Sequence, residues 1–413
     1  MMNIKIAYIT LFFSVTSFII NAQTQPKKGI WRGVLLLNPE KNRELPFNFE
    51  IKKVGDKSQL IIHNALERIT VTEVISKKDS FNFKMPVFDS EFLCQLIGDT
   101  LLKGLWINHA KKENNIIPFT AVYGNSKRFL FLPGKSNPVY EGKWEVSFSP
   151  NAKDSSKAMG VFTHPNGSSY VTGTFLTETG DYRYLDGMMH NGMLYLSCFD
   201  GSHAYLFTAE NNGIEIINGH FYAGTTWEEP WIGKRNDAFK LKDPEEITKL
   251  KTQTSKVEFS FNNVLDKKVS LNDVRYKNKP VIIQIMGTWC PNCMDETAYL
   301  AGLYNRYSKQ GLEIIALTYE RTQDLTKIKN NINRLKTKFD ARYEFLITGL
   351  TGKNKATESL PFLNEITTFP TLIVLDKNHN VKTIYAGFNG PATGSEYNTF
   401  TTLFEKLIKE LVK

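Results

Sequence analysis

The residues with the clearest chemical signal are Cys290 and Cys293, which lie in the segment GTWCPNC at residues 287–293. A thiolate attacks a disulfide sulfur to form a mixed disulfide, which a second nearby thiol can then resolve. Because the first cysteine of such a pair is the more exposed, we expect Cys290 to attack and Cys293 to resolve. The spacing therefore predicts thiol–disulfide exchange.

A zinc site and an inert structural disulfide are the alternatives for this pair. A zinc site needs a second pair of ligands, but Cys94 and Cys198 stand alone in the sequence and the seven histidines are scattered. An inert disulfide is disfavoured because a strand–helix junction presents the sulfur of Cys290. We predict no metal site and no cofactor. Cys94 and Cys198 lie in apolar strands and are expected to be buried free thiols, although a disulfide between them stays open.

The elements around the pair predict an α/β domain over residues 257–413. Apolar runs at 281–286, 312–317 and 371–375 are typical of buried strands. A cysteine at a helix start faces unpaired N–H groups and the positive end of the helix dipole, which favour thiolate over thiol. Three helices are indicated by apolar stripes at Leu300, Leu303, Tyr304 and Tyr307, at Leu325, Ile328, Ile332, Leu335 and Phe339, and at Phe400, Leu403, Phe404, Leu407 and Leu411.

Residues 23–241 predict an all-β domain, either a barrel or a sandwich, because short alternating runs are separated by turn signals. A faint internal repeat relates GIW at 29–31 to GKW at 142–144, and GLWI at 104–107 to GHFY at 219–222. Two halves of five or six strands each would follow. The tryptophans are expected to be core or strand-pair residues (Trp31, Trp106, Trp144, Trp227 and Trp231). A polar connector at 242–256, with a helix start at 243–246, leads to the α/β domain.

The first 22 residues predict a signal peptide, because Lys5 precedes an apolar run at 6–20 and Ala22 offers a cleavage site. The run is short for a bilayer span, which needs about 20 apolar residues. We therefore expect export to the periplasm, where thiols can be oxidised, and no membrane span after cleavage. An uncleaved N-terminal anchor is the alternative.

The composition excludes several classes of protein. The chain has 413 residues, of which 41% are hydrophobic and 23% charged, so it is neither disordered nor a polytopic membrane protein. Its length makes a single core unlikely and predicts several domains. The net charge of +9 is spread without a dense basic block, so no nucleic-acid partner is expected.

Residues from about 256 onward resemble the TlpA/ResA-type thioredoxin-like thiol–disulfide oxidoreductases. The resemblance rests on WCPNC at 289–293, TFPT at 368–371 and GFNGP at 387–391. It implies a thioredoxin fold in which the Phe369–Pro370 bond is cis and lies beside the cysteines, a minority state for such bonds. It also implies that Trp289, Phe369 and Pro370 contact the substrate. An ordinary trans proline is the alternative.

The resemblance further implies that Glu296, one helical turn after Cys293, relays a proton to the cysteines. A solvated carboxylate in the first helical turn is the alternative, and it is the expectation for Asp295. Glu320 is a weaker candidate. Thioredoxins carry a buried acid on the strand six residues before the first cysteine, where this sequence has Gln284, so Glu296 would have more of the proton handling.

The implied function is that of a periplasmic oxidoreductase acting on protein disulfides, with reduction favoured and a role in cytochrome c maturation. Its partners would be protein thiols or disulfides and an upstream membrane redox donor. A thiol peroxidase is an alternative, although its threonine lies three residues before the reactive cysteine and Thr288 lies two before Cys290. Another is a β domain that binds a ligand or partner beside a non-catalytic module. The stretch FDGSH at 199–203 resembles Bacteroidetes-type two-domain proteins, whose β domain would recruit substrates or partners.

Overall fold

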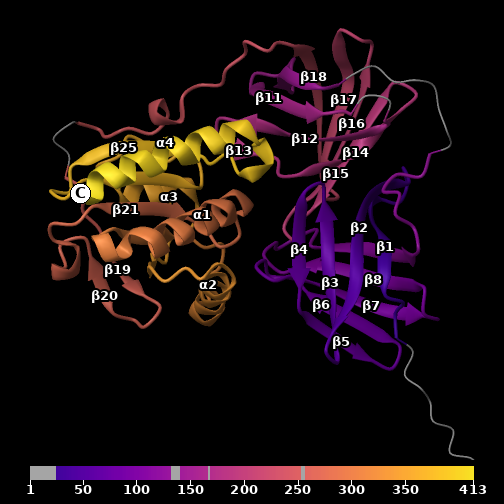
Figure 1. Ribbon diagram of the computed structural model, residues 1–413, viewed down its shortest axis with the longest axis horizontal. Helices are drawn as coiled ribbons and strands as arrows, with labels where there is room; N and C mark the ends of the chain where they lie inside the picture. The colour runs from indigo at the N-terminus through magenta and orange to yellow at the C-terminus, as the bar shows by residue number, and fades with distance from the viewer. Residues whose placement is uncertain (1–24, 132–139, 166–167, 253–255) are drawn as a thin grey trace, which may run out of the picture.

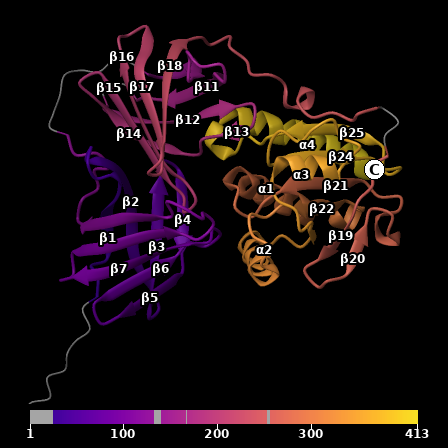
Figure 2. The ribbon, with the colours of Figure 1, turned by 180° about the vertical axis from the view of Figure 1, so that it is seen from behind.

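The computed structural model describes residues 25–131, 140–165, 168–252 and 256–413. The predicted signal peptide lies outside these ranges. The described chain forms two β regions, here called the first (25–131) and second (140–235), and a C-terminal α/β domain (256–413). Both β regions lie on one side of the α/β domain, as the two opposite views show (Figures 1 and 2). No helix within the described ranges is long and apolar enough to cross a bilayer.

The first β region is an antiparallel sheet of nine strands in residues 25–131, which are described throughout. Their order across the sheet is β4-β3-β2-β1-β9-β8-β7-β6-β5. Alternate side chains along each strand face the same side of the sheet, and those on one face form a core rich in phenylalanine. The strands are β1 (Gly29–Asn38), β2 (Arg43–Val54), β3 (Lys57–Asn64), β4 (Glu67–Val71), β5 (Glu73–Lys77), β6 (Ser80–Lys84), β7 (Ser90–Ile97), β8 (Leu101–Asn108) and β9 (Ile116–Tyr123).

The second β region is a closed barrel, because β11 pairs with both β10 and β12. Within its described residues the order is β11-β10-β18-β17-β16-β15-β14-β12-β13. Closure leaves few unpaired edges, and a second aromatic core fills the interior. The strands are β10 (Gly142–Phe148), β11 (Ser156–Thr163), β12 (Tyr170–Thr177), β13 (Gly180–Asp181), β14 (Leu185–His190), β15 (Met193–Phe199), β16 (Ala204–Asn211), β17 (Glu215–Ala223) and β18 (Trp227–Arg235).

The internal repeat has a structural counterpart. Trp31 on β1 and Trp144 on β10 are both buried, and each indole N–H donates to the carbonyl four residues earlier, at 2.9 and 2.8 Å. Each half has nine described strands rather than the five or six expected, because short strands such as the two-residue β13 leave no readable alternation. Four of the five tryptophans are buried, but Trp227 is 56% exposed at the start of β18.

The C-terminal domain has a seven-stranded sheet in residues 256–413, all described, with the order β20-β19-β23-β22-β21-β24-β25. Strands β21, β22 and β23 are parallel, and β24 runs antiparallel to β21. All six residues of β21 are buried, which explains why all of them except Gln284 are apolar. The strands are β19 (Ser260–Asn263), β20 (Lys268–Ser270), β21 (Val281–Met286), β22 (Glu313–Thr318), β23 (Glu344–Ile347), β24 (Thr371–Leu375) and β25 (Val381–Ala386).

Four α-helices in this domain pack around the sheet: α1 (Pro291–Tyr307), α2 (Leu325–Phe339), α3 (Gly352–Ser359) and α4 (Ser395–Val412). The multidomain prediction, all-β followed by a thioredoxin-like α/β domain, is confirmed. Two residues of the predicted stripes are wrong, since Leu325, the first residue of α2, is 54% exposed and Leu403, in the middle of α4, is 62% exposed.

The connector at 242–256 differs from its prediction. The helix start at 243–246 is only a single 3₁₀ turn, η1 (Pro244–Glu246), capped by the Asp243 side chain. No apolar face follows it that could stabilise a longer helix by packing. Instead the connector adheres to the C-terminal domain through an isolated bridge between Leu250 and Leu363. The other one-turn helices are η2 (Val274–Tyr276), η3 (Ser308–Gln310) and η4 (Pro391–Thr393).

Candidate active site

The two cysteines meet at the N-terminus of α1. Cys290 is the N-cap residue, and its sulfur accepts the backbone N–H of Cys293 at 3.3 Å. The Cys290 thiol also donates to the carbonyl of Phe369 at 3.4 Å, and the Phe369–Pro370 peptide bond is cis, as the resemblance implies. Both cysteines are free thiols and buried, with 6% and 0% exposure. The structure thus brings the cysteine pair beside the cis peptide bond, although Cys290 and Phe369 are 79 residues apart in the sequence.

The loop before Cys290 is fixed by Glu320, which follows β22. The backbone N–H and the hydroxyl of Thr288 both donate to the Glu320 carboxylate, at 2.9 and 2.7 Å. The Trp289 indole donates to the carbonyl of Tyr319 at 3.0 Å. Burial raises the pKa of Glu320, and the two bonds from Thr288 oppose that shift. Glu320 therefore anchors the loop that presents Cys290.

Glu296 lies inside the domain. It is 1% exposed, and one carboxylate oxygen accepts the amide of Gln284 at 2.9 Å while the other has no partner within the described residues. Burial raises its pKa to about 8. The pKa of the Cys293 thiol is also raised, chiefly by burial and in smaller part by the hydrogen bond with Cys290 and the charge of Glu296. The alternative of a solvated first-turn acid is wrong for Glu296.

Asp295 is not the solvated acid that we expected. It forms a salt bridge with Arg183 of the second β region, and both side chains are largely buried. The Arg183 guanidinium also contacts Glu67 of the first β region at 2.5 Å and Asp200 at 3.7 Å. Burial raises the pKa of Asp295, and the Arg183 charge opposes that shift. One cation therefore ties both β regions to the helix that carries the cysteines.

Asn292, which lies between the two cysteines, also contacts the second β region. With its amide oriented to satisfy both partners, Asn292 donates to the carbonyl of Asp181 at 3.2 Å and accepts its N–H at 3.1 Å. A Cβ at Gly180 would lie 1.9 Å from the Asn292 amide, so this approach requires glycine. The Asp181 carboxylate in turn accepts the N–H of Gly390, at 2.5 Å.

The turn at 200–203 packs against the same site. The His203 imidazole lies 3.1 Å from the Asp200 carboxylate and stacks on Tyr205. The hydroxyl of Ser202 donates to the carbonyl of Trp289 at 3.4 Å. The turn thus supports the backbone immediately before Cys290.

Cys94 and Cys198 are buried free thiols, which confirms the favoured expectation. Burial raises the pKa of Cys94 to about 12 and also raises that of Cys198. Within the described residues, no group of three histidine, cysteine or acidic side chains is arranged to hold a metal ion.

Comparison with known proteins supports the same region. Residues 253–400 match the AhpC/TSA family model. The thiol-disulfide oxidoreductase ResA of Bacillus thuringiensis (strain Al Hakam) is 37% identical over 81 residues, which cover 20% of this chain and 44% of ResA. ResA of Geobacillus thermodenitrificans is 30% identical over 112 residues, covering 27% and 57%. The chain thus spans about half the length of the curated relatives it matches.

Solved structures are also similar to part of this chain. A thioredoxin-family thiol:disulfide interchange protein from Chlorobium tepidum TLS is 18% identical, with a TM-score of 0.30, and covers 39% of this chain and 97% of its own. A thiol-disulfide oxidoreductase from Bacteroides fragilis is 17% identical, with a TM-score of 0.28, and covers 36% and 99%. Residues 253–400 thus match the AhpC/TSA family model, and the chain is similar in part to ResA thiol-disulfide oxidoreductases.

Proposed function

We propose that this protein is an exported, periplasmic thiol–disulfide oxidoreductase that exchanges disulfides with protein substrates, with reduction favoured. One observation carries the proposal: the Cys290 sulfur lies at the start of α1 and 3.4 Å from the carbonyl that precedes cis-Pro370. An extended substrate segment can pair with the Phe369 backbone beside that sulfur, as edge-strand recognition does elsewhere. The similarity to ResA supports the same chemistry.

The proposed reduction proceeds in two exchanges. The Cys290 thiolate attacks one sulfur of the substrate disulfide, so a Cys290–substrate bond forms while the substrate S–S bond breaks and its second sulfur leaves as a thiolate. Cys293 then loses its proton and attacks the Cys290 sulfur, which releases the first substrate sulfur. The substrate gains two electrons and two protons, and the protein closes a Cys290–Cys293 disulfide. A membrane dithiol donor returns two electrons and two protons.

Glu296 is the proposed base for Cys293. The raised pKa of Cys293 means that its proton must be removed during the second exchange. A carboxyl with a pKa of about 8 can both accept and release a proton near neutral pH. We therefore assign Glu296 to proton relay. Export is part of this proposal because the sequence predicts a signal peptide. The membrane donor and the role in cytochrome c maturation are part of it because of the family resemblance.

The test uses single cysteine variants of the full mature chain with an oxidised protein substrate. Cys290→Ser should abolish exchange, whereas Cys293→Ser should accumulate a mixed disulfide that non-reducing electrophoresis detects. Cys94→Ser is the control and should exchange at the unchanged rate. If Cys290→Ser retains exchange, or reduced protein consumes peroxide quickly and leaves protein disulfides intact, the proposal is wrong.

The redox direction has its own measurement. The reduction potential of the Cys290–Cys293 pair should lie nearer the thioredoxin value of about −270 mV than the DsbA value of about −120 mV. For a two-electron couple, about 30 mV shifts the equilibrium tenfold, so this interval decides the direction. A potential near the DsbA value would contradict the reductase assignment and leave disulfide exchange intact.

A further inference from the structure

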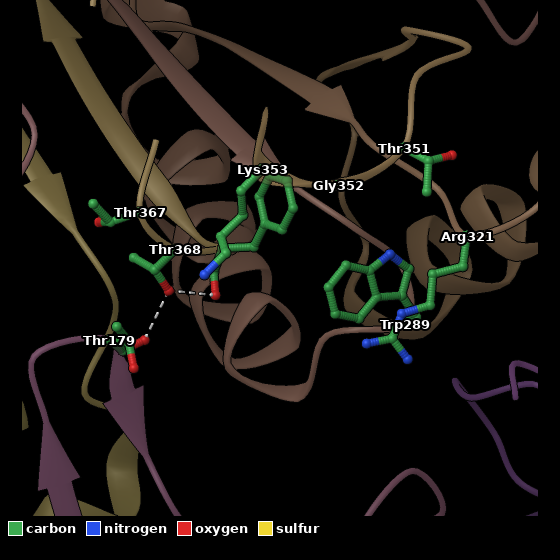
Figure 3. Close-up of a pocket in the computed structure, with 9 residues that line it drawn as sticks. Thr179, Trp289, Arg321, Thr351, Gly352, Lys353, Thr367 and Thr368 are labelled. Carbon is green, nitrogen blue, oxygen red and sulfur yellow. Dashed lines mark hydrogen bonds between the residues drawn. The ribbon is translucent and has the colours of Figure 1, made fainter. Parts of the chain in front are cut away.

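A pocket of about 410 Å³ lies beside the proposed reaction site and belongs to two regions of the chain (Figure 3). Most of its lining residues, among them Trp289, Thr368 and Phe369, belong to the C-terminal domain. Thr179, in the turn between β12 and β13 of the second β region, forms the wall next to Thr368 and lies away from Trp289 and Arg321. The Thr368 hydroxyl donates to the Thr179 carbonyl at 3.2 Å, which fixes this wall against the segment that precedes cis-Pro370.

The charges of the pocket have one sign. Among its described lining residues, Arg321 and Lys353 are cationic and none is acidic. The Arg321 guanidinium lies 3.7 Å from the centre of the Trp289 ring, so its position is set by a cation–π contact. Neither cation forms a salt bridge within the described part of the chain, whereas Lys355, two residues further along α3, pairs with Glu358 at 2.6 Å. The pocket therefore presents two positive charges that no salt bridge engages.

The pocket is close to the attacking sulfur. Partial burial lowers the pKa of Arg321, and the charge of Cys290 is the largest effect opposing that shift. Trp289 and Phe369 both line the pocket. Trp289 precedes Cys290 in the sequence, and the Phe369 carbonyl accepts a hydrogen bond from the Cys290 thiol. A substrate segment whose cysteine reaches Cys290 would therefore place a neighbouring side chain in the pocket, because side chains of an extended segment project within a few residues of one another.

We propose that this pocket binds a carboxylate of the protein substrate, so that the enzyme prefers disulfides whose cysteine is flanked by aspartate or glutamate. The inference rests on the proposed function and deepens it by naming the class of substrate segment. The apolar faces of Trp289 and Phe369 contact the stem of that side chain, and Arg321 and Lys353 bind its carboxylate. Because Thr179 forms one wall, the second β region takes part in this selection.

The test compares three oxidised peptides that share one cystine and differ at a single flanking position, which is Glu, Gln or Lys. Their reduction by the full mature chain is followed under a constant supply of a dithiol reductant. We expect kcat/KM to be about 10-fold higher for the Glu peptide than for the Gln peptide, and lowest for the Lys peptide, as charged contacts of this kind permit. High salt should reduce the preference, because it screens exposed charges.

Single variants of the pocket residues test whether the pocket causes the preference for the Glu peptide over the Gln peptide. Arg321→Gln and Lys353→Gln should each reduce it about 3-fold, and the matched control Lys355→Gln, which removes an equal charge outside the pocket, should retain it. Equal kcat/KM for the Glu and Gln peptides with the unmodified protein would overturn the inference while the exchange chemistry stands. Failure to reduce any of the three peptides would instead contradict the proposed function, and the inference with it.

Discussion

Glu296→Gln should remove the loss of stability that the buried Glu296 carboxyl causes in the C-terminal domain as pH rises. The carboxyl of Glu296 is buried beside Gln284, with a pKa of about 8, whereas a glutamate in an unfolded chain ionises with a pKa of about 4.3. Between these values the folded state keeps a proton that the unfolded state has lost. Stability must therefore fall as pH rises from about 4.3 through about 8. Glutamine has the same shape and does not titrate.

The size of the effect follows from the two pKa values. Each pH unit between them costs the wild-type protein about 1.4 kcal/mol of unfolding free energy. From pH 5 to pH 8, allowing for partial titration at both ends, the free energy of unfolding of Glu296→Gln should rise relative to wild type by about 3.5 kcal/mol. Any pH-independent difference in hydrogen bonding cancels, because only the change with pH is compared. Since Glu296 is 1% exposed, solvent screening does not reduce this figure.

Urea unfolding followed by the circular dichroism of the helices measures this difference, since the described α-helices all lie in the C-terminal domain. The reduced wild type and variant are compared at four or more pH values. Glu410→Gln, on the exposed side of α4, is the matched control and should show no such trend. If the stability difference between Glu296→Gln and wild type is flat with pH, then Glu296 titrates like an exposed carboxyl and its assignment as proton relay fails.

Two further predictions concern the β regions. Arg183→Met leaves the carboxylates of Glu67, Asp200 and Asp295 without their shared cation. The free energy of unfolding should therefore fall by about 3–5 kcal/mol, and the alkylation of Cys290 should become faster. An unchanged urea midpoint would show that the cluster does not contribute to stability. Limiting iodoacetamide should label Cys290 before Cys94 or Cys198, because burial raises the pKa of both of these thiols whereas Cys290 caps a helix N-terminus, which favours thiolate. Mass spectrometry of the first adduct decides this, and a first adduct on Cys94 would contradict the assignment.

Much of the C-terminal fold could be predicted because its central elements are long and periodic. Leu300 and Leu303 are fully buried on α1, and five of the six residues of β21 are apolar because the whole strand is buried. Short peripheral elements escaped notice. Helix α3 has eight residues and buries only Ala356, and β20 has three residues, so neither produces a period that a sequence window can detect.

For the site, what could be predicted depends on whether a residue belongs to a local motif or has a partner far away in the sequence. Cys290, Cys293 and cis-Pro370 belong to short local motifs, whose meaning depends on a strand or helix beside them. Arg183 lies 112 residues from Asp295, and the sequence carries no signal of that pairing. An acid in the first turn of a helix is ordinarily solvated and favoured by the dipole. Asp295 departs from that expectation only because a different region of the chain covers it.

The contacts of the second β region bear on where the redox properties reside. It touches four segments around the dithiol site: the loop before Cys290, the residues between and after the cysteines, the segment before cis-Pro370 and the loop after β25 (through Trp289, Asn292, Asp295, Thr368 and Gly390). A β region that merely recruited partners could be attached anywhere on the surface. Removing it would instead expose the Asp295 carboxylate, free the Asn292 amide and open one wall of the cationic pocket. We therefore expect the proposed reduction potential and substrate preference to depend on the whole chain, so residues 257–413 alone should not reproduce them.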